Sequence, residues 1–323
     1  MRQFLKERFT NMNARLVWHD SYLLRGMILS KTIFPEKREE LDALIRLWVK
    51  GIINTQDIHV GVTDYNGMSD YGWSCNIYSD NGEPIRYLLH SGIIGSAILE
   101  AVMYLPESDS VRIDVLSQMK NLIETFQREW YQKGEERYEF PRDIPESRVH
   151  GIDGIPVNHE AAWIEFLARY QDITRTHDYD KFIKNFQYKM NLIQKWTYYW
   201  KLPGYNNSIK LEDIPHAAIV LKAVAYIGWE KFPQFLEKVS ESVLFQNSYY
   251  TTYQIISHFV NEDVPGSNRD YLALYNGWNL LPTEIKGLEL IRTKEVYIIL
   301  MAKKSWSSFD LWNALAYTHE TKD

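Results

Sequence analysis

The chain has 323 residues, of which 45% are apolar, so it can bury a sizeable core. Its formal net charge of −6, without any block of Lys and Arg, argues against nucleic-acid binding. A single cysteine, Cys75, excludes an internal disulfide framework and a thiolate zinc site. No apolar run reaches the roughly eighteen residues that a membrane span needs. Because residues 1–8 are charged, we expect no signal peptide: the chain is cytoplasmic as given, or secreted or periplasmic if a leader has been removed.

Apolar residues at helical spacing dominate the chain. Such stripes occupy residues 41–52, 116–130, 163–170, 182–193, 220–227 and 232–239. They predict helices that begin near His19, Lys37, His90, Val111, Asn158, Tyr179, Pro215, Glu230, Tyr249 and Arg269. Residues 61–84 predict a long structured loop or small hairpin, and residues 133–157 a second long loop. Residues 295–301 are the best candidate for a strand.

Alternate helix starts recur at intervals of roughly 55 to 70 residues, near positions 19, 90, 158, 215 and 269. Each interval holds two helices, which indicates helix hairpins laid side by side. We therefore predict one mainly α domain over residues 1–323, an incomplete or closed (α/α)n toroid with a minor β element. In a toroid the inner helices run parallel, so that their N-terminal ends share one rim.

The predicted rim gathers residues that can do acid–base chemistry. The five starts carry His19, His90, Asn158 with His159, His216, and Arg269 with Tyr271. Capping explains an Asn at such a position. It does not explain the histidines, because a helix N-terminus disfavours a protonated imidazole. A neutral imidazole there can accept a proton, so we interpret the rim as a candidate active site.

β-Elimination from a uronic acid sugar needs this inventory. Removal of the C5 proton builds negative charge on the neighbouring carboxylate, which amide, arginine or acid donors must neutralise. A His or a tyrosinate takes the proton, and a Tyr hydroxyl protonates the departing glycosidic oxygen. The rim therefore predicts an acidic polysaccharide or oligosaccharide as the substrate.

Three segments resemble α/α-toroid uronate polysaccharide lyases, of the alginate and glucuronan lyase kind, and related enzymes of glucuronyl sugars. They are Asn158-His159-Glu160-Ala161-Ala162-Trp163, Glu212-Asp213-Ile214-Pro215-His216-Ala217-Ala218 and Tyr87-Leu88-Leu89-His90-Ser91-Gly92. The likeness spans roughly residues 71–280 and rests on short motifs. Ala217 departs from it, because Gly is frequent at that place.

The resemblance implies roles for individual residues. Asn158 would neutralise the substrate carboxylate, assisted by Glu212 or Arg269. His216 would be the base, with His159 the next candidate, and Tyr271 or Tyr275 the acid. Apart from the resemblance, we expect His90 and His19 of the rim to bind substrate, and the high aromatic share leads us to expect Tyr71, Trp73 and Trp278 to stack on sugar rings. No cofactor is implied, although a divalent cation held by the histidines is an alternative.

Other functions remain open at this point. A glycoside hydrolase needs two carboxylates, which Glu160, Glu212, Asp213 and Asp270 could supply. A uronate C5-epimerase begins with the same proton abstraction as a lyase. A non-catalytic helical scaffold that binds a glycan or peptide would leave the rim histidines apart from one another.

Overall fold

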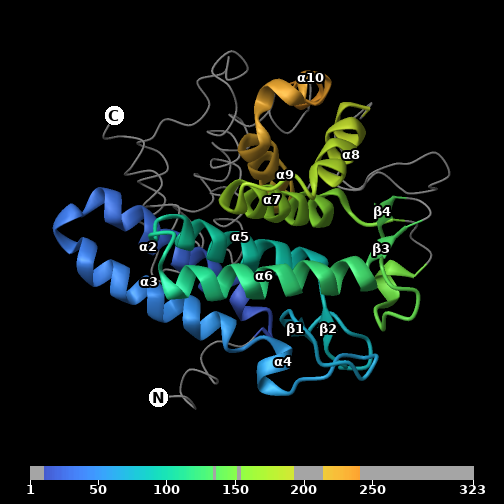
Figure 1. Ribbon diagram of the computed structural model, residues 1–323. Coiled ribbons are helices and arrows are strands. Elements are labelled where there is room, and N and C mark those ends of the chain that lie inside the picture. Colours follow the sequence, from blue (N-terminus) through green and yellow to red (C-terminus); the bar gives the residue numbers. More distant parts are fainter. Residues whose placement is uncertain (1–10, 134–135, 151–153, 193–213, 241–323) are drawn as a thin grey trace, which may run out of the picture.

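The structure, a computed structural model, describes residues 11–133, 136–150, 154–192 and 214–240 (Figure 1). Within these ranges the chain is mainly helical, which confirms that part of the predicted fold class. The α-helices are α2 (Ser21–Ile33), α3 (Arg38–Ile53), α4 (Asp57–Val60), α5 (Leu88–Met103), α6 (Ser110–Glu129), α7 (Val157–Thr174), α8 (Asp180–Asn191), α9 (Ile214–Ile227) and α10 (Pro233–Ser240). A π-helical turn at Leu16–Asp20 leads into α2, and 3-10 turns occupy Pro35–Lys37, Ser147–Val149 and Trp229–Lys231.

The strands are short: β1 and β4 lie within the two predicted loop regions, and β2 and β3 directly adjoin them. Strand β1 (Ser74–Cys75) pairs antiparallel with β2 (Ile85–Arg86), and β3 (Tyr131–Gln132) pairs antiparallel with β4 (Arg137–Tyr138). The first hairpin thus closes the Gly- and Asp-rich segment that the sequence predicts to be a structured loop. The predicted strand at 295–301 and the helices predicted near Tyr249 and Arg269 lie outside the described residues.

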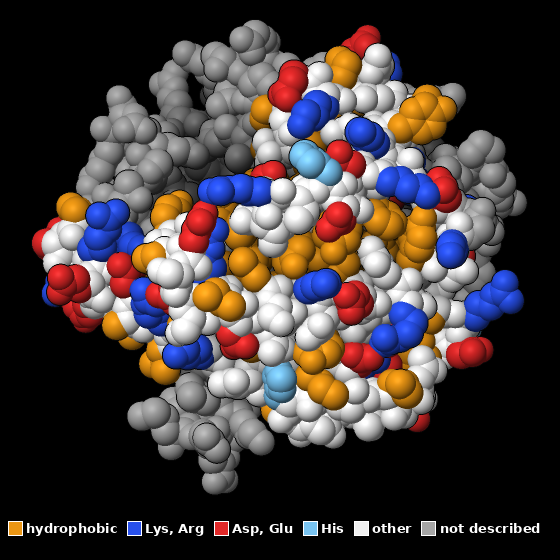
Figure 2. Space-filling view, in the orientation of Figure 1, with side chains coloured by type: hydrophobic (Ala, Val, Ile, Leu, Met, Phe, Trp, Pro, Cys, Tyr) orange, Lys and Arg blue, Asp and Glu red, His pale blue; other side chains and the backbone are white. Residues whose placement is uncertain are grey.

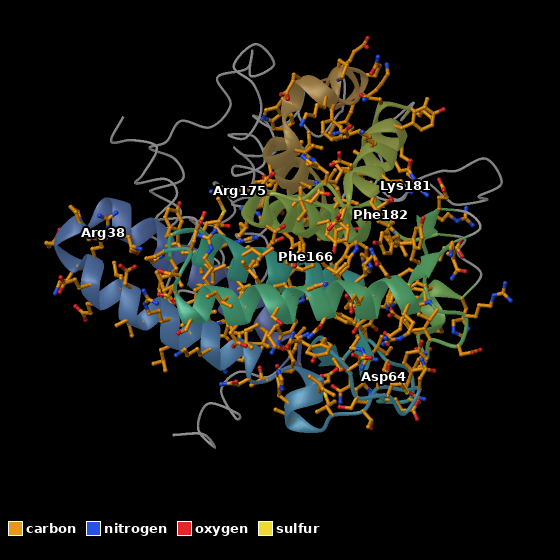
Figure 3. The ribbon with its side chains drawn as sticks, viewed as in Figure 1. Arg38, Asp64, Phe166, Arg175, Lys181 and Phe182 are labelled. Carbon is orange, nitrogen blue, oxygen red and sulfur yellow. The ribbon has the colours of Figure 1, made fainter. Side chains whose placement is uncertain are left out.

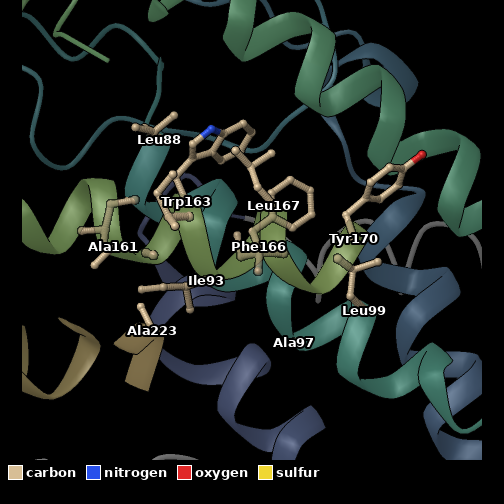
Figure 4. Close-up of a cluster of buried hydrophobic side chains, with 14 of the residues drawn as sticks. Leu88, Ile93, Ala97, Leu99, Ala161, Trp163, Phe166, Leu167, Tyr170 and Ala223 are labelled. Atoms are coloured by element: carbon tan, nitrogen blue, oxygen red, sulfur yellow. The ribbon is translucent and has the colours of Figure 1, made fainter. Parts of the chain in front are cut away.

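Helices α2, α5, α7 and α9 form one layer in which α5 packs on α2 and α7, and α7 packs on α9. All four run in the same direction. A Cβ placed on Gly92 of α5 would meet Ala162 of α7, and one on Gly95 would meet Phe166, so both helices advance together. Figure 4 shows the same order, with Leu88, Ile93 and Ala97 running alongside Ala161, Trp163 and Phe166.

The other neighbouring pairs of this layer are parallel for the same reason. Trp18, which precedes α2, contacts His90 of α5. Arg25, seven residues after Trp18, pairs with Glu100, ten residues after His90, so α2 and α5 run in the same direction. Between α7 and α9, Glu165 pairs with Lys222 and the later Arg169 stacks on the later Tyr226. The N-terminal ends of the four helices therefore lie at one end of the layer.

The remaining long helices cover this layer from outside. α3 packs on α2 and α6, α6 packs on α5 and α7, and α8 packs on α7 and α10. Aromatic residues fill the space between the layers: Phe126 of α6 lies 4.9 Å from Trp163, whose ring centre is 5.0 Å from that of Phe166. Phe166 lies at the centre of the molecule (Figure 3). Burial of each such ring stabilises the fold by about 1.5–3 kcal/mol.

The surface carries both charge signs. On the face shown in Figure 2, basic and acidic side chains are interspersed, and apolar atoms are visible along the groove between α6 and α7. Among the described helices, none is long and apolar enough to cross a lipid bilayer.

Candidate active site at the shared helix ends

The starts of α5, α7 and α9 bring three predicted positions to one end of the inner layer. His90 is the third residue of α5, Asn158 and His159 are the second and third of α7, and His216 is the third of α9. His19 lies in the π-helical turn that precedes α2. For His216 only the backbone position is described. Four of the five predicted helix starts therefore lie at one end of the layer, and the fifth, near Arg269, lies outside the described residues.

Asn158 is the least satisfied polar residue of this end. Its side chain is fully buried, at 0% exposure, and neither amide atom has a hydrogen-bond partner. It does not cap its helix, since the N-cap residue is Pro156 and no side-chain cap bond is present. Asn158 lies one turn before Ala162, whose backbone a Cβ on Gly92 of α5 would meet. A buried amide without partners costs free energy, which is typical of a group that awaits a ligand or water.

His90 is held as a neutral imidazole. Its Nδ1 lies 3.2 Å from the amide nitrogen of Asn11, which also donates to the carbonyl of Trp73. Asn11 Oδ1 accepts from Val17 N, which fixes the orientation of the amide. Because an amide nitrogen only donates, Nδ1 of His90 accepts and Nε2 carries the proton. Burial lowers the pKa of His90 to about 3, so the ring stays uncharged at neutral pH.

Three aromatic rings surround this imidazole, an arrangement that sequence analysis did not predict. The ring centres of Trp18, Tyr78 and Tyr87 lie 5.9, 5.7 and 5.0 Å from that of His90. Trp18 Nε1 donates to the hydroxyl of Tyr78, and the Tyr87 hydroxyl donates to Glu146. Burial and the Glu146 carboxylate raise the pKa of Tyr87 above its usual range, so its hydroxyl stays protonated. Tyr87 is the first residue of the 87–92 motif, which was the available signal.

Two further histidines of this end, His159 and His19, are more exposed than His90. The ring of His159 is partly buried and lies edge-on to Phe140, with ring centres 5.6 Å apart. The side chain of His19 is 42% exposed, and its Nδ1 lies 3.5 Å from Asp20. His19 is thus a surface group, whereas Asn158 and His90 are interior groups.

The two aromatic residues predicted to stack on sugars differ from each other. Tyr71 is partly exposed, and its ring stands edge-on to that of His59 at 6.2 Å. Trp73 is 1% exposed, and its indole N–H donates to the carbonyl of Ile52 at 3.0 Å. Because no face of the Trp73 ring is open, packing accounts for this residue, and we do not retain it as a stacking residue.

Several predicted residues cannot be placed. Glu212, Arg269, Tyr271, Tyr275 and Trp278 lie outside the described residues. Glu160 forms an ion pair of 2.6 Å with Lys189 of the outer helix α8. In the described ranges no three His, Cys, Asp or Glu side chains are grouped as a metal site would require.

Comparisons with known proteins return no matching family model, curated protein or solved structure.

Proposed function

We propose that the protein is a polysaccharide lyase that cleaves a uronic-acid-containing glycan by β-elimination. The helix hairpins of the described part would continue as a closed or incomplete α/α toroid, with the substrate at the end where the inner helices begin. The observation that carries the proposal is the Asn158 amide, which is buried at that end without a protein partner. An amide N–H is the donor that a carboxylate needs as its negative charge increases.

The reaction divides among residues of this end. Asn158 donates to the uronate carboxylate, with Arg269 or Glu212 assisting. His216 removes the C5 proton, with His159 as the next candidate. The electrons of the broken C5–H bond form a C4–C5 double bond, and the glycosidic oxygen at C4 leaves with a proton from Tyr271 or Tyr275. His90 supports the site as a neutral hydrogen-bonding group, since burial holds its pKa far below neutrality.

One observation weighs against a hydrolase. Of the four carboxylates that could form a hydrolytic pair, Glu160 is engaged by Lys189 on the outer layer. A glycoside hydrolase would therefore depend on Glu212, Asp213 and Asp270 alone. A lyase needs no such pair.

The test is incubation with alginate, glucuronan and other polyuronates, followed by ultraviolet absorbance of the unsaturated uronate and by reducing-end analysis. We expect both signals from at least one polymer. New reducing ends without ultraviolet absorbance would indicate a hydrolase in place of a lyase. Absence of both signals would indicate a non-catalytic scaffold. The Asn158→Ala and His216→Ala variants should fold but lose product. His177→Ala, at a side chain that is 87% exposed, is the matched control and should keep activity.

A further inference from the structure

Five charged side chains meet inside the inner layer, away from the helix ends. They are Arg25 of α2, Glu100 of α5, Glu165 and Arg169 of α7, and Lys222 of α9. Each of the four parallel helices thus contributes at least one. Glu165 follows Asn158 by seven residues on the same face of α7, so the cluster lies about 10 Å further along that helix.

The cations of the cluster converge on one oxygen. Oε1 of Glu165 lies 2.9 Å from Nε of Arg169, 3.5 Å from Nζ of Lys222 and 3.7 Å from Nη2 of Arg25. Glu100 is shared more loosely, with its Oε2 at 3.3 Å from Nε of Arg25 and 3.8 Å from Nη2 of Arg169. Of these contacts only the one between Arg169 and Glu165 is a hydrogen bond.

Arg25 has two donor atoms, Nε and Nη2, that make no hydrogen bond. It is 3% exposed, and its buried Nε and Nη2 atoms make ionic contacts but no hydrogen bond. Buried guanidinium N–H groups are normally paired, and a planar fork of donors matches the two oxygens of an oxyanion. Arg25 therefore has donors for a ligand that the two glutamates do not satisfy.

The protonation behaviour of the cluster agrees with crowded positive charge. Burial, together with the neighbouring Arg25, lowers the pKa of Lys222 to about 7 against the opposite effect of Glu165 and Glu100. Burial alone would raise the pKa of Glu165, yet Lys222, Arg169 and Arg25 outweigh it and hold that pKa at about 2. Another negative charge placed among these cations would be stabilised.

Two side chains of the cluster are partly exposed: that of Glu100 is 22% exposed and that of Lys222 is 18% exposed, whereas Arg25 is 3% and Glu165 5% exposed. We infer that the cluster is a binding site for a small oxyanion of the carboxylate type, held by the guanidinium of Arg25 with Arg169 and Lys222 beside it. This inference does not depend on the reaction at the helix ends.

The experiment is a titration of the full-length chain with sodium acetate, sodium glucuronate and sodium sulfate, followed by calorimetry at constant ionic strength. Sodium chloride is the reference. We expect saturable binding of the oxyanions beyond the chloride reference. Preference for acetate and glucuronate would identify a carboxylate ligand. Preference for sulfate would identify an inorganic oxyanion that binds the same guanidinium of Arg25. The absence of saturable binding for all three would overturn the inference.

Two variants test the assignment to Arg25. Arg25→Gln leaves two cations with two glutamates, so it should fold, and it should bind the oxyanion at least about tenfold more weakly, as the loss of a charge-assisted hydrogen bond implies. Glu100→Gln removes a carboxylate that competes for Arg25, so it should bind more tightly than the wild type. Circular dichroism checks the fold of both. Unchanged affinity in folded Arg25→Gln, or weaker affinity in Glu100→Gln, would contradict the assignment.

Discussion

Substitution of Gly92 by Ala should separate α5 from α7 and destabilise the protein. A Cβ at this position would lie 2.7 Å from the carbonyl carbon and oxygen of Ala162 and 2.8 Å from the nitrogen of Trp163. All three are backbone atoms of a helix, so no side-chain rotation relieves the overlap. Overpacking of a core costs about 1–3 kcal/mol, and we take the upper end because backbone must move. Ala gains about 1 kcal/mol over Gly in helix propensity, which leaves a net loss of about 2 kcal/mol.

The assay is urea unfolding followed by circular dichroism, with Ser91→Ala as the control. Ser91 neighbours Gly92 in α5, and its buried hydroxyl has no hydrogen-bond partner, so its removal should leave the free energy of unfolding nearly unchanged. If Gly92→Ala instead gains the helix-propensity term and is more stable than the wild type, the close approach of α5 and α7 is refuted.

Three further predictions concern buried groups. His90 stays neutral in the folded chain with a pKa of about 3 but titrates near 6.5 when unfolded, so its contribution to stability is present above pH 6.5 and is lost as the pH falls toward 3. Between pH 6 and pH 4 the free energy of unfolding should therefore fall less steeply in His90→Gln than in the wild type, by up to about 1.4 kcal/mol per pH unit. Equal slopes of the two proteins in equilibrium unfolding would contradict the assignment. Glu165→Gln should lower the free energy of unfolding by about 3–5 kcal/mol, because three buried cations lose a shared carboxylate. Chemical unfolding should show a smaller loss for Glu100→Gln, because Glu100 is more exposed. Trp73→Phe should lower the melting temperature, since it removes core volume and the bond to Ile52, but should leave polyuronate binding unchanged; weakened binding by the intact fold would return Trp73 to the site.

Helix positions were predictable because their signals are local. Starts expected near Lys37, Val111 and Asn158 are observed at Arg38, Ser110 and Val157. Apolar periodicity and helix-terminal residues act over a few neighbouring positions, so they can be read without the tertiary structure. The alternation of inner and outer helices also followed from spacing alone.

The surroundings of the site were less predictable, because they depend on long-range packing. Trp73 lies in a Gly- and Asp-rich segment typical of exposed loops, yet its indole reaches Ile52 in the core. The charge cluster joins residues as distant as Arg25 and Lys222. Its one local signal was Glu165 and Arg169, a pair four residues apart within an apolar helix.

The most direct test of the central claim is release of the hydrogen bound to C5 of a uronate. A polyuronate labelled with deuterium at C5 is incubated with the protein, and the label that appears in water is measured by mass spectrometry. We predict that the wild type releases the label from at least one polymer and that Asn158→Ala, correctly folded, releases it at least about a hundredfold more slowly, as expected for loss of one donor to a developing oxyanion. Equal release by Asn158→Ala, or no release by the wild type from any polyuronate, would contradict the account.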